Sequence, residues 1–293
     1  MSKIDLSNVS MSGFDDIFTN NTDEVPAIKV ALSELHEFDG HPFRVVDDQL
    51  TELVDSIKSK GVLEPGIVRP RKNGGYEIIS GHRRRRACEL AGLTEMPVRV
   101  MDYSDDDATI IMVDSNLHRE EILPSEKAKS YAMKFNAMKH QGKEGGKSLE
   151  VMSDSLGEGM KTIQRYIWLA RLIEGLIELV DKEMIPFTAG VDLSFLNPTY
   201  QQLVLQWIES RKINTVTVAQ AKEVHLRVNN LGVHFMQADL ENIFFSKEAP
   251  EKSRLKPFKF KKNRVSEFFP PDTSNEEIEE VIYSLLEKWK NEH

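Results

Sequence analysis

The chain has 293 residues, of which 40% are hydrophobic and 29% charged, a balance typical of a soluble globular protein of two or three domains. No apolar run approaches the roughly 20 residues of a membrane span, and the single cysteine, Cys88, excludes an internal disulfide, so we expect a cytoplasmic protein. The net charge of −9 is only weak evidence against a nucleic-acid partner, because the arginines cluster while acids collect at 102–107 and 276–280.

Residues 1–24 are polar with little periodicity, which is typical of a flexible tail. From residue 25 to about 140 the pattern is that of an α/β domain. Asn73-Gly74-Gly75 strongly predicts a hairpin between two β-rich segments, and an apolar stripe that ends at Gly61 predicts a helix. The expected strands are 28–32, 67–71, 76–79 and 96–101, and the expected helices are 47–60, 83–91, one opened by the acids at 102–107, and 125–138.

Residues 141–147 are rich in glycine and lysine and are interpreted as a linker that marks a domain boundary. The next part of the chain, 148–228, is predicted to be all-helical, and it begins with two helices around a glycine-bearing turn, the pattern of a helix-turn-helix. A plain helical bundle is the alternative interpretation. The helices are expected at 149–156, 160–173, 199–209 and 217–228, with the turn at 157–159.

The end of the chain has a weaker pattern. Residues 229–255 are interpreted as a connecting region, and 256–293 as a small unit of one strand and one helix. That helix begins at a capping box and carries one apolar stripe, which so small a unit cannot bury alone. We therefore expect a dimerisation unit, with docking onto the rest of the same chain as the alternative.

Four successive arginines, Arg83 to Arg86, follow Gly81 at the start of an expected helix. The N-terminus of a helix already carries partial positive charge, so cations stacked there indicate a bound polyanion. A glycine at this bend lets the backbone turn tightly and lets an anion come close. The alternative is a solvated basic helix start, because charge runs are usually only surface.

Three ordered segments resemble the ParB (ParB/RepB) family of chromosome and plasmid partition proteins. Gly61 to Pro70, GVLEPGIVRP, is similar to the family's G-[IV]-L-x-P-[IL]-x-V-R, and Ser80 to Ala87, SGHRRRRA, is similar to its G-[EH]-R-R-x-R-A box. Ser115 to Glu120, SNLHRE, is similar to E-N-L-[QH]-R. The resemblance covers roughly 28–190. It implies an α+β fold with a ParB-like (sulfiredoxin-like) α/β N-terminal domain and an all-helical helix-turn-helix middle domain, followed here by the small strand-helix unit.

The resemblance also implies a nucleotide-gated DNA clamp that binds CTP with Mg²⁺. Gly81 would admit a phosphate, and Arg83 and Arg84 could neutralise it with bidentate hydrogen bonds. Asn116 could offer an oxygen to Mg²⁺, and Arg119 could contact a phosphate or pair with a nearby acid. The expected nucleotide-binding residues are Ser80, Gly81, His82, Arg83, Arg84, Asn116 and Arg119, with Asn116 also as the metal ligand.

The sequence departs from the family pattern at two positions. His82 stands where many members have Glu, and Ser115 stands where the third box usually has Glu. A serine is a weaker metal ligand than a carboxylate and cannot act as a general base in the same way. Nucleotide binding is therefore the firmer expectation, and a weak CTPase activity stays open.

The second helix of the helix-turn-helix is expected to enter the DNA major groove. Gln can pair with adenine and Arg with guanine, whereas Thr and Lys suit phosphate or either base. Core positions are expected at Ile163, Ile167 and Leu169, and Trp168 is expected to pack rather than stack on bases. The expected DNA-binding residues are Lys161, Thr162, Gln164 and Arg165.

The partners implied are double-stranded DNA with a palindromic site, a second copy of the chain, and a ParA-type ATPase, on a nucleoid or plasmid in the cytoplasm. A transcriptional regulator or nucleoid-occlusion-type protein with the same DNA contacts is an alternative. A nucleotide-dependent kinase on the same scaffold is another, although Ser115 removes the obvious catalytic carboxylate. Sulfiredoxin chemistry is disfavoured, because His82 and Arg83 follow Gly81 where it needs a cysteine.

Overall fold

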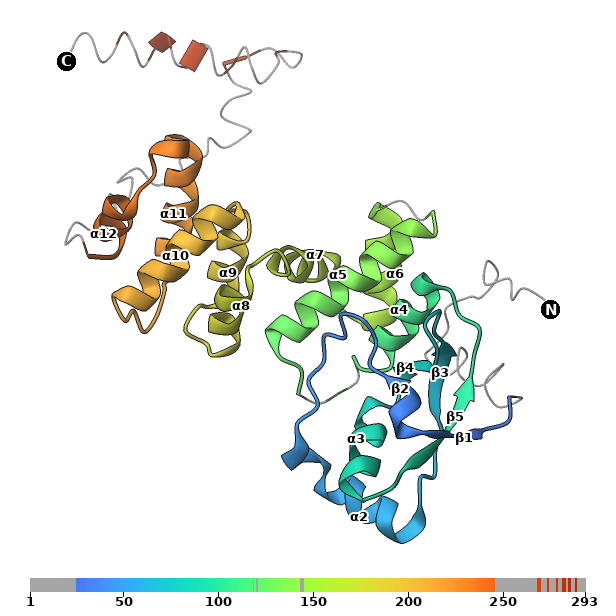
Figure 1. Ribbon diagram of the computed structural model, residues 1–293. Helices are drawn as coiled ribbons and strands as arrows, with labels where there is room; N and C mark the ends of the chain where they lie inside the picture. Colours follow the sequence, from blue (N-terminus) through green and yellow to red (C-terminus); the bar gives the residue numbers. More distant parts are fainter. Residues whose placement is uncertain are drawn as a thin grey trace. The chain divides into compact units, whose positions relative to one another are not determined.

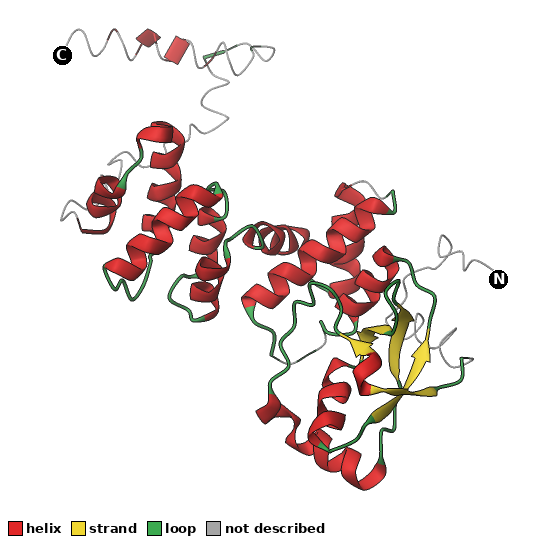
Figure 2. Ribbon diagram, in the orientation of Figure 1, coloured by secondary structure: helices red, strands yellow, loops and turns green. Residues whose placement is uncertain are grey.

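The computed structural model describes residues 25–245 apart from 118, 120, 143 and 144, together with a few isolated positions beyond 267 (Figures 1 and 2). The chain divides into two compact units, Met1–Phe244 and Phe245–His293. The expected tail at 1–24 lies outside the described residues, and so does the expected strand-helix unit at 256–293 apart from those isolated positions.

The strands form one five-stranded sheet in the order β1-β5-β3-β4-β2. The hairpin expected at Asn73-Gly74-Gly75 is confirmed, because β3 and β4 pair antiparallel on either side of it. β5 returns parallel to β3, and β1 pairs antiparallel with β5 at one edge. The strands are β1 (Ile28–Ala31), β2 (Leu35–His36), β3 (Gly66–Pro70), β4 (Tyr76–Ser80) and β5 (Glu95–Val100). All except the two-residue β2 were expected.

Both faces of the sheet are buried. Successive strand residues point to opposite faces, so Val68 and Ile78 pack in one core cluster while Ile67 and Ile79 pack in another. The first cluster includes α2 and α3, and the second includes α4 (Figure 1). The elements that flank the sheet or follow it are η2 (Leu32–Glu34), η3 (Asp47–Leu50), α2 (Thr51–Lys60), α3 (His82–Leu90), α4 (Asp105–Asp114) and α5 (Pro124–His140).

These helix ends follow local sequence signals. Gly61 ends α2 with φ of +74°, a conformation that favours glycine. Ser104 caps α4 by accepting a hydrogen bond from the backbone N–H of Asp107 at 3.1 Å, and acidic residues fill the first turn, where negative charge suits the helix dipole. Pro124 stands in the first turn of α5, as expected.

The rest of the described chain is helical, which confirms the mixed α+β architecture. The helix-turn-helix pair is α6 (Gly145–Leu156) and α7 (Met160–Leu169). α7 ends four residues before the expected end at Ile173. The helices that follow are α8 (Glu174–Asp181), α9 (Phe187–Leu193), α10 (Pro198–Ser210), α11 (Val218–Leu231), η4 (Gly232–His234) and α12 (Gln237–Phe245).

Two expected connections differ from the structure. α6 already begins at Gly145, inside the expected linker 141–147, and it packs against α5. Residues 237–245, expected within a connecting region, instead form α12, whose Leu240 is fully buried in the core of the helical part. The domain division itself stays a prediction, because the described residues up to Phe244 belong to one compact unit.

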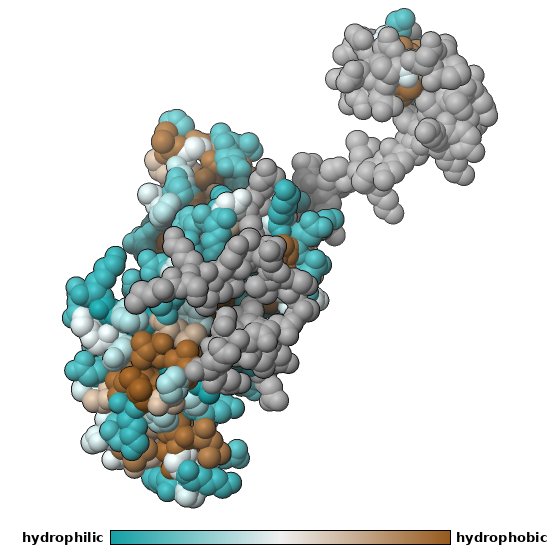
Figure 3. Space-filling view, turned by 90° about the vertical axis from the view of Figure 1, so that its right-hand side faces the viewer, coloured by the Kyte–Doolittle hydropathy of each residue, from teal (hydrophilic) through white to brown (hydrophobic). Residues whose placement is uncertain are grey.

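The surface carries both polar and apolar side chains. Figure 3 shows one face, on which hydrophobic residues reach the surface in patches separated by hydrophilic ones. Within the described part of the chain, none of the helices combines the length and the apolar character needed to cross a membrane.

Candidate nucleotide site and helix-turn-helix

The bend between β4 and α3 needs glycine for two reasons. Gly81 has φ of +113°, which side-chain-bearing residues rarely adopt. A Cβ added to Gly81 would also lie 3.2 Å from the Cα of Gly66, at the start of β3. Gly66 is itself crowded, because its own added Cβ would meet Cε of Met96 at 2.9 Å. The expected tight turn is therefore confirmed, and close packing of two strands requires it.

The four arginines of α3 do not form one cation cluster. Adjacent helix residues point about 100° apart, and the guanidinium groups reach several partners, although Arg85 and Arg86 both contact Glu89. Arg84 donates to the carbonyl oxygens of Glu64 and Pro65 at 2.9 and 2.7 Å. Arg85 pairs with Glu89 at 3.0 Å, and Arg86 pairs with Asp47 at 2.6 Å. Three of the four are thus held by acceptors within the protein.

Arg83 differs from its neighbours. It is exposed, and the hydrogen bond found for it is to the backbone carbonyl of Gln49 at 3.2 Å. Its positive charge acts on Arg119, which comes from the third sequence box: burial first, and then the charge of Arg83, lower the pKa of Arg119 from its ordinary value. Two of the expected phosphate contacts therefore lie within electrostatic reach of each other.

Arg119 is held in a defined position. Its Nη1 donates to the carbonyl oxygen of Arg44 at 3.3 Å, and its guanidinium carbon lies 5.2 Å from the ring centroid of Phe43. Asn116, three residues earlier, is 7% exposed and donates from Nδ2 to the carbonyl of Met112 at 2.8 Å. The amide nitrogen of Asn116 is thus engaged by a carbonyl of α4, which leaves the amide oxygen of Asn116 as the atom for a metal.

Two histidine rings lie against each other beside this region, tilted by 35°. The rings of His41 and His82 are 3.9 Å apart between centroids, and His82 is 7% exposed. Burial lowers the pKa of His41 to about 4, and burial followed by the neighbouring His41 lowers the pKa of His82 to about 2. Nε2 of His82 accepts a hydrogen bond from the backbone N–H of Phe38 at 3.5 Å. Both rings are neutral at physiological pH, so the positive charge here comes from arginines.

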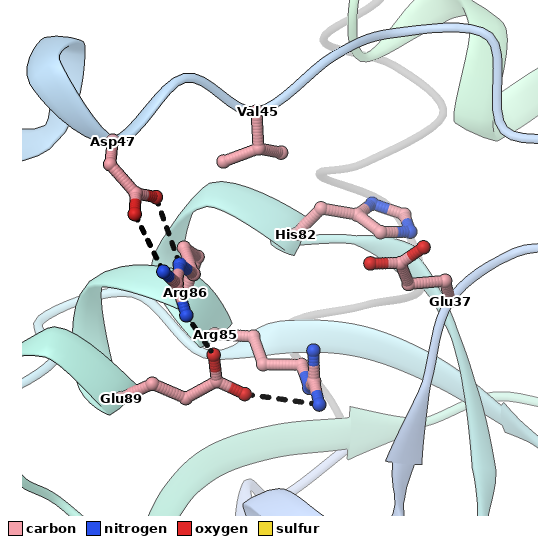
Figure 4. A pocket seen from close by; sticks show the side chains of 7 residues that line it. All are labelled: Glu37, Val45, Asp47, His82, Arg85, Arg86 and Glu89. Carbon is pink, nitrogen blue, oxygen red and sulfur yellow. Dashed lines mark hydrogen bonds and ion pairs between the residues drawn. The ribbon is translucent and has the colours of Figure 1, made fainter.

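A cavity of about 450 Å³ opens on one side of α3 (Figure 4). Figure 4 shows Arg86 reaching Asp47 and Glu89, Arg85 reaching Glu89, and His82 lying beside Glu37. Nε of Arg85 is buried without a hydrogen-bond partner among the described residues. The lining residues are Glu37, Val45, Asp47, His82, Arg85, Arg86 and Glu89.

Of the expected nucleotide-binding residues, only His82 lines this cavity. Arg119 lines another cavity, of about 270 Å³, which reaches the turn between α6 and α7. The residues of that cavity are Leu117, Arg119, Ile122, Lys127, Tyr131, Leu156, Glu158 and Tyr166. The acids Glu37 and Asp47 were missed by the sequence reasoning, because they belong to none of the three boxes and only the fold brings them to α3.

The helix-turn-helix has the expected core. Ile163 and Leu169 are fully buried and Ile167 is 9% exposed. Trp168 packs against Phe195, with ring centroids 5.1 Å apart, which confirms that it is a packing residue.

The four expected DNA contacts lie on α7 and differ in exposure. Lys161 and Thr162 are exposed, whereas Gln164 and Arg165 are half-buried. Arg165 donates to Oγ1 of Thr188 at 2.7 Å, so its guanidinium is anchored to α9.

Comparison with known proteins gives a matching family model and several relatives. A sequence model described as the ParB N-terminal domain matches residues 16–117. The probable chromosome 1-partitioning protein ParB of Deinococcus radiodurans is 38% identical over 135 residues, 46% of this chain and 44% of that protein. A nucleoid occlusion protein of Geobacillus thermodenitrificans is 31% identical over 194 residues, 66% of each chain.

One solved structure is also similar, though distantly. It is C-terminally truncated ParB from Caulobacter crescentus complexed with CTP-gamma-S, which is 23% identical with a TM-score of 0.30 and is covered over 99% of its length by 61% of this chain. A likeness of that size carries no inference about function. The chain spans about half the length of the first curated relatives it matches. The family model over residues 16–117, together with these relatives, shows that the chain carries a ParB N-terminal domain.

Proposed function

We propose that this chain is a DNA-binding partition protein that is switched to a DNA clamp when CTP binds its N-terminal domain. The observation that carries the proposal is the uncapped glycine bend at the start of α3, with Arg83 in the first turn of that helix. Arg119, from a separate sequence box, lies within reach of the charge of Arg83. Two like charges held close together cost energy unless an anion joins them, so the arrangement suits a phosphate.

The start of α3 supports the same conclusion. Among the described residues, no side chain caps the helix at Gly81, so its first N–H groups have no side-chain acceptor. Such a helix start attracts phosphate through both hydrogen bonds and the helix dipole. Gly81 itself is explained by its close packing on Gly66, where a Cβ would lie 3.2 Å from the Cα of Gly66. It is the uncapped helix start, with Arg83 in its first turn, that fits a triphosphate.

The fit to Mg²⁺ is weaker. Asn116 offers one neutral oxygen, and the hydroxyl of Ser115 donates to the carbonyl of Met112 at 2.9 Å. Mg²⁺ prefers carboxylate and phosphate oxygens, so in this proposal the triphosphate supplies most of its ligands and Asn116 supplies one. The choice of CTP over other nucleotides rests on the family resemblance. A weak CTPase activity is left to experiment, because Ser115 stands where the family usually has a Glu that could act as a general base.

Duplex DNA is the proposed partner of α7, through Lys161, Thr162, Gln164 and Arg165. A palindromic site would need two copies of the chain, which the C-terminal segment would join. A ParA-type ATPase follows from the family alone. A nucleoid-occlusion role is the second candidate, because the alignment with the Geobacillus relative covers 66% of each chain.

A nucleotide panel tests the proposal. Calorimetry of the purified chain with CTP, ATP, GTP and UTP, each with Mg²⁺, should give saturable binding for CTP alone. Binding of none of the four would refute the nucleotide switch. Equal binding of all four nucleotides would support a triphosphate site but would show that the site is not specific for cytosine.

A further inference from the structure

Two adjacent side chains in the first turn of α5 contact opposite parts of the molecule. Glu126, 6% exposed, accepts hydrogen bonds from the backbone N–H of Arg44 at 2.7 Å and from that of Leu123 at 3.1 Å. Lys127, the next residue, forms an ion pair with Glu158 in the turn between α6 and α7. One helical turn therefore connects the loop beside the proposed nucleotide site with the helix-turn-helix.

On the nucleotide side, Arg44 is held at both of its backbone polar groups. Its N–H donates to Glu126, and its carbonyl oxygen accepts from Arg119 at 3.3 Å. The negative charge of Glu126 also acts on Arg119, against the effects of burial and of Arg83. Any anion that binds between Arg83 and Arg119 thus competes with Arg44 and Glu126 for the same guanidinium.

On the helix-turn-helix side, Lys127 lies in an aromatic and acidic setting. Its ammonium is 4.9 Å from the ring centroid of Tyr166 and 5.6 Å from that of Tyr131. The side chains of Lys127 and Glu158 are 23% and 25% exposed, so solvent screens this pair less than an ordinary surface pair. The backbone carbonyl of Glu158 is fixed by the hydroxyl of Ser153 at 2.7 Å.

The two sides meet in space as well as through α5. Arg119, Lys127 and Glu158 all line the cavity of about 270 Å³ described above. A displacement of Arg119 toward an anion would therefore change the surroundings of the ion pair directly.

We propose that Lys127 is a positioning residue that transmits occupancy of the nucleotide site to the helix-turn-helix, a step that rests on the proposed function. A triphosphate draws Arg119 away from the carbonyl of Arg44, and the loop is then held only by the hydrogen bond from its backbone N–H to Glu126, in the first turn of α5. The hold of Lys127 on Glu158 then weakens, and the turn between α6 and α7 opens more often. By thermodynamic linkage, a ligand that holds the turn closed must weaken nucleotide binding by the same factor by which the nucleotide weakens binding of that ligand.

Hydrogen–deuterium exchange of the full chain tests this step without a known DNA site. Peptides that span 150–166 are followed with and without CTP and Mg²⁺, while calorimetry measures CTP affinity separately. In the wild type we expect faster exchange across the turn when CTP is bound. In Lys127→Met we expect fast exchange already without CTP, and loss of the CTP-dependent change.

Two further variants separate transmission from a merely structural role. Lys129→Met is a matched control, because Lys129 lies on the same helix and pairs with Glu174 of α8 rather than with the helix-turn-helix. It should respond to CTP as the wild type does. The exchanged pair Lys127→Glu with Glu158→Lys should restore the response, because it rebuilds the ion pair with its charges reversed.

The outcomes are distinct. If the wild type binds CTP and Lys127→Met keeps the full response, or if the wild type binds CTP and the turn does not respond, the transmission step is overturned while the proposed function stands. If the wild type binds no CTP in the calorimeter, the proposed function fails and this step fails with it.

Discussion

Lys134 is completely buried and offers the sharpest stability prediction. Its side chain on α5 is 0% exposed, and its Nζ lies 2.5 Å from Oδ1 of Asp114, at the end of α4. Ser155 on α6 adds a hydroxyl oxygen at 3.4 Å. A buried lysine is rare unless it is paired, so this contact joins three helices around one charge.

The magnitude follows from charge and burial. At 2.5 Å and an effective dielectric constant of about 20, the attraction is about 7 kcal/mol. Most of that offsets the desolvation of the two ions, so the pair contributes little net stability. Lys134→Met, however, leaves the 15% exposed Asp114 carboxylate without its cation. We expect this variant to lose about 3 kcal/mol, which corresponds to a decrease in Tm of about 5 °C for a chain of this size.

Replacing both partners separates the two effects. In Lys134→Met with Asp114→Leu no charge is left unpaired, and apolar replacements of a buried pair are often neutral. We expect stability within about 1 kcal/mol of the wild type, measured by urea unfolding and calorimetry. Lys129→Met, at an exposed pair, should cost less than about 1 kcal/mol. The reasoning is refuted if the double variant is as unstable as Lys134→Met alone, or if Lys134→Met unfolds like the wild type.

Three other predictions concern charge and recognition. Arg83→Ala and Arg119→Ala should each weaken CTP binding by at least about tenfold in calorimetry, because each removes a charge-assisted phosphate contact; unchanged affinity would remove that arginine from the site. Because the pKa values of His41 and His82 are lowered in the folded protein, the unfolded chain binds more protons than the folded one below about pH 6.5. The free energy of unfolding should therefore decrease as the pH is lowered from 7.5 to 5, by on the order of 2 kcal/mol for each imidazole. His82→Gln should flatten that slope in urea titrations at pH 7.5 and 5, and an unaltered slope would contradict the buried neutral pair. Arg165→Ala should weaken binding to a duplex selected from a random library more than to unselected DNA, and equal loss on both would make Arg165 a phosphate contact.

The sequence by itself determined the local structure of this chain. The Asn73-Gly74-Gly75 turn fixes the β3–β4 hairpin, because both of its glycines have positive φ, a conformation that few other residues adopt. Gly81 marks the bend before α3 for the same reason. The apolar spacing along α7 placed Ile163 and Leu169 in the core, because a helix turns by a constant angle per residue. The three family boxes then indicated the N-terminal domain from residue identity alone.

The tertiary structure decided which of these residues meet. Four arginines adjacent in sequence diverge because each helix residue turns by a constant angle. Glu89 is a local partner one turn away on the same helix, whereas only the fold brings Glu64 to Arg84 and Asp47 to Arg86. Contacts such as His41 with His82 leave no periodic signal in the sequence, because each joins segments separated by long stretches of chain. Local pattern therefore sets the elements and their buried faces, whereas partner choice depends on how the sheet and helices pack.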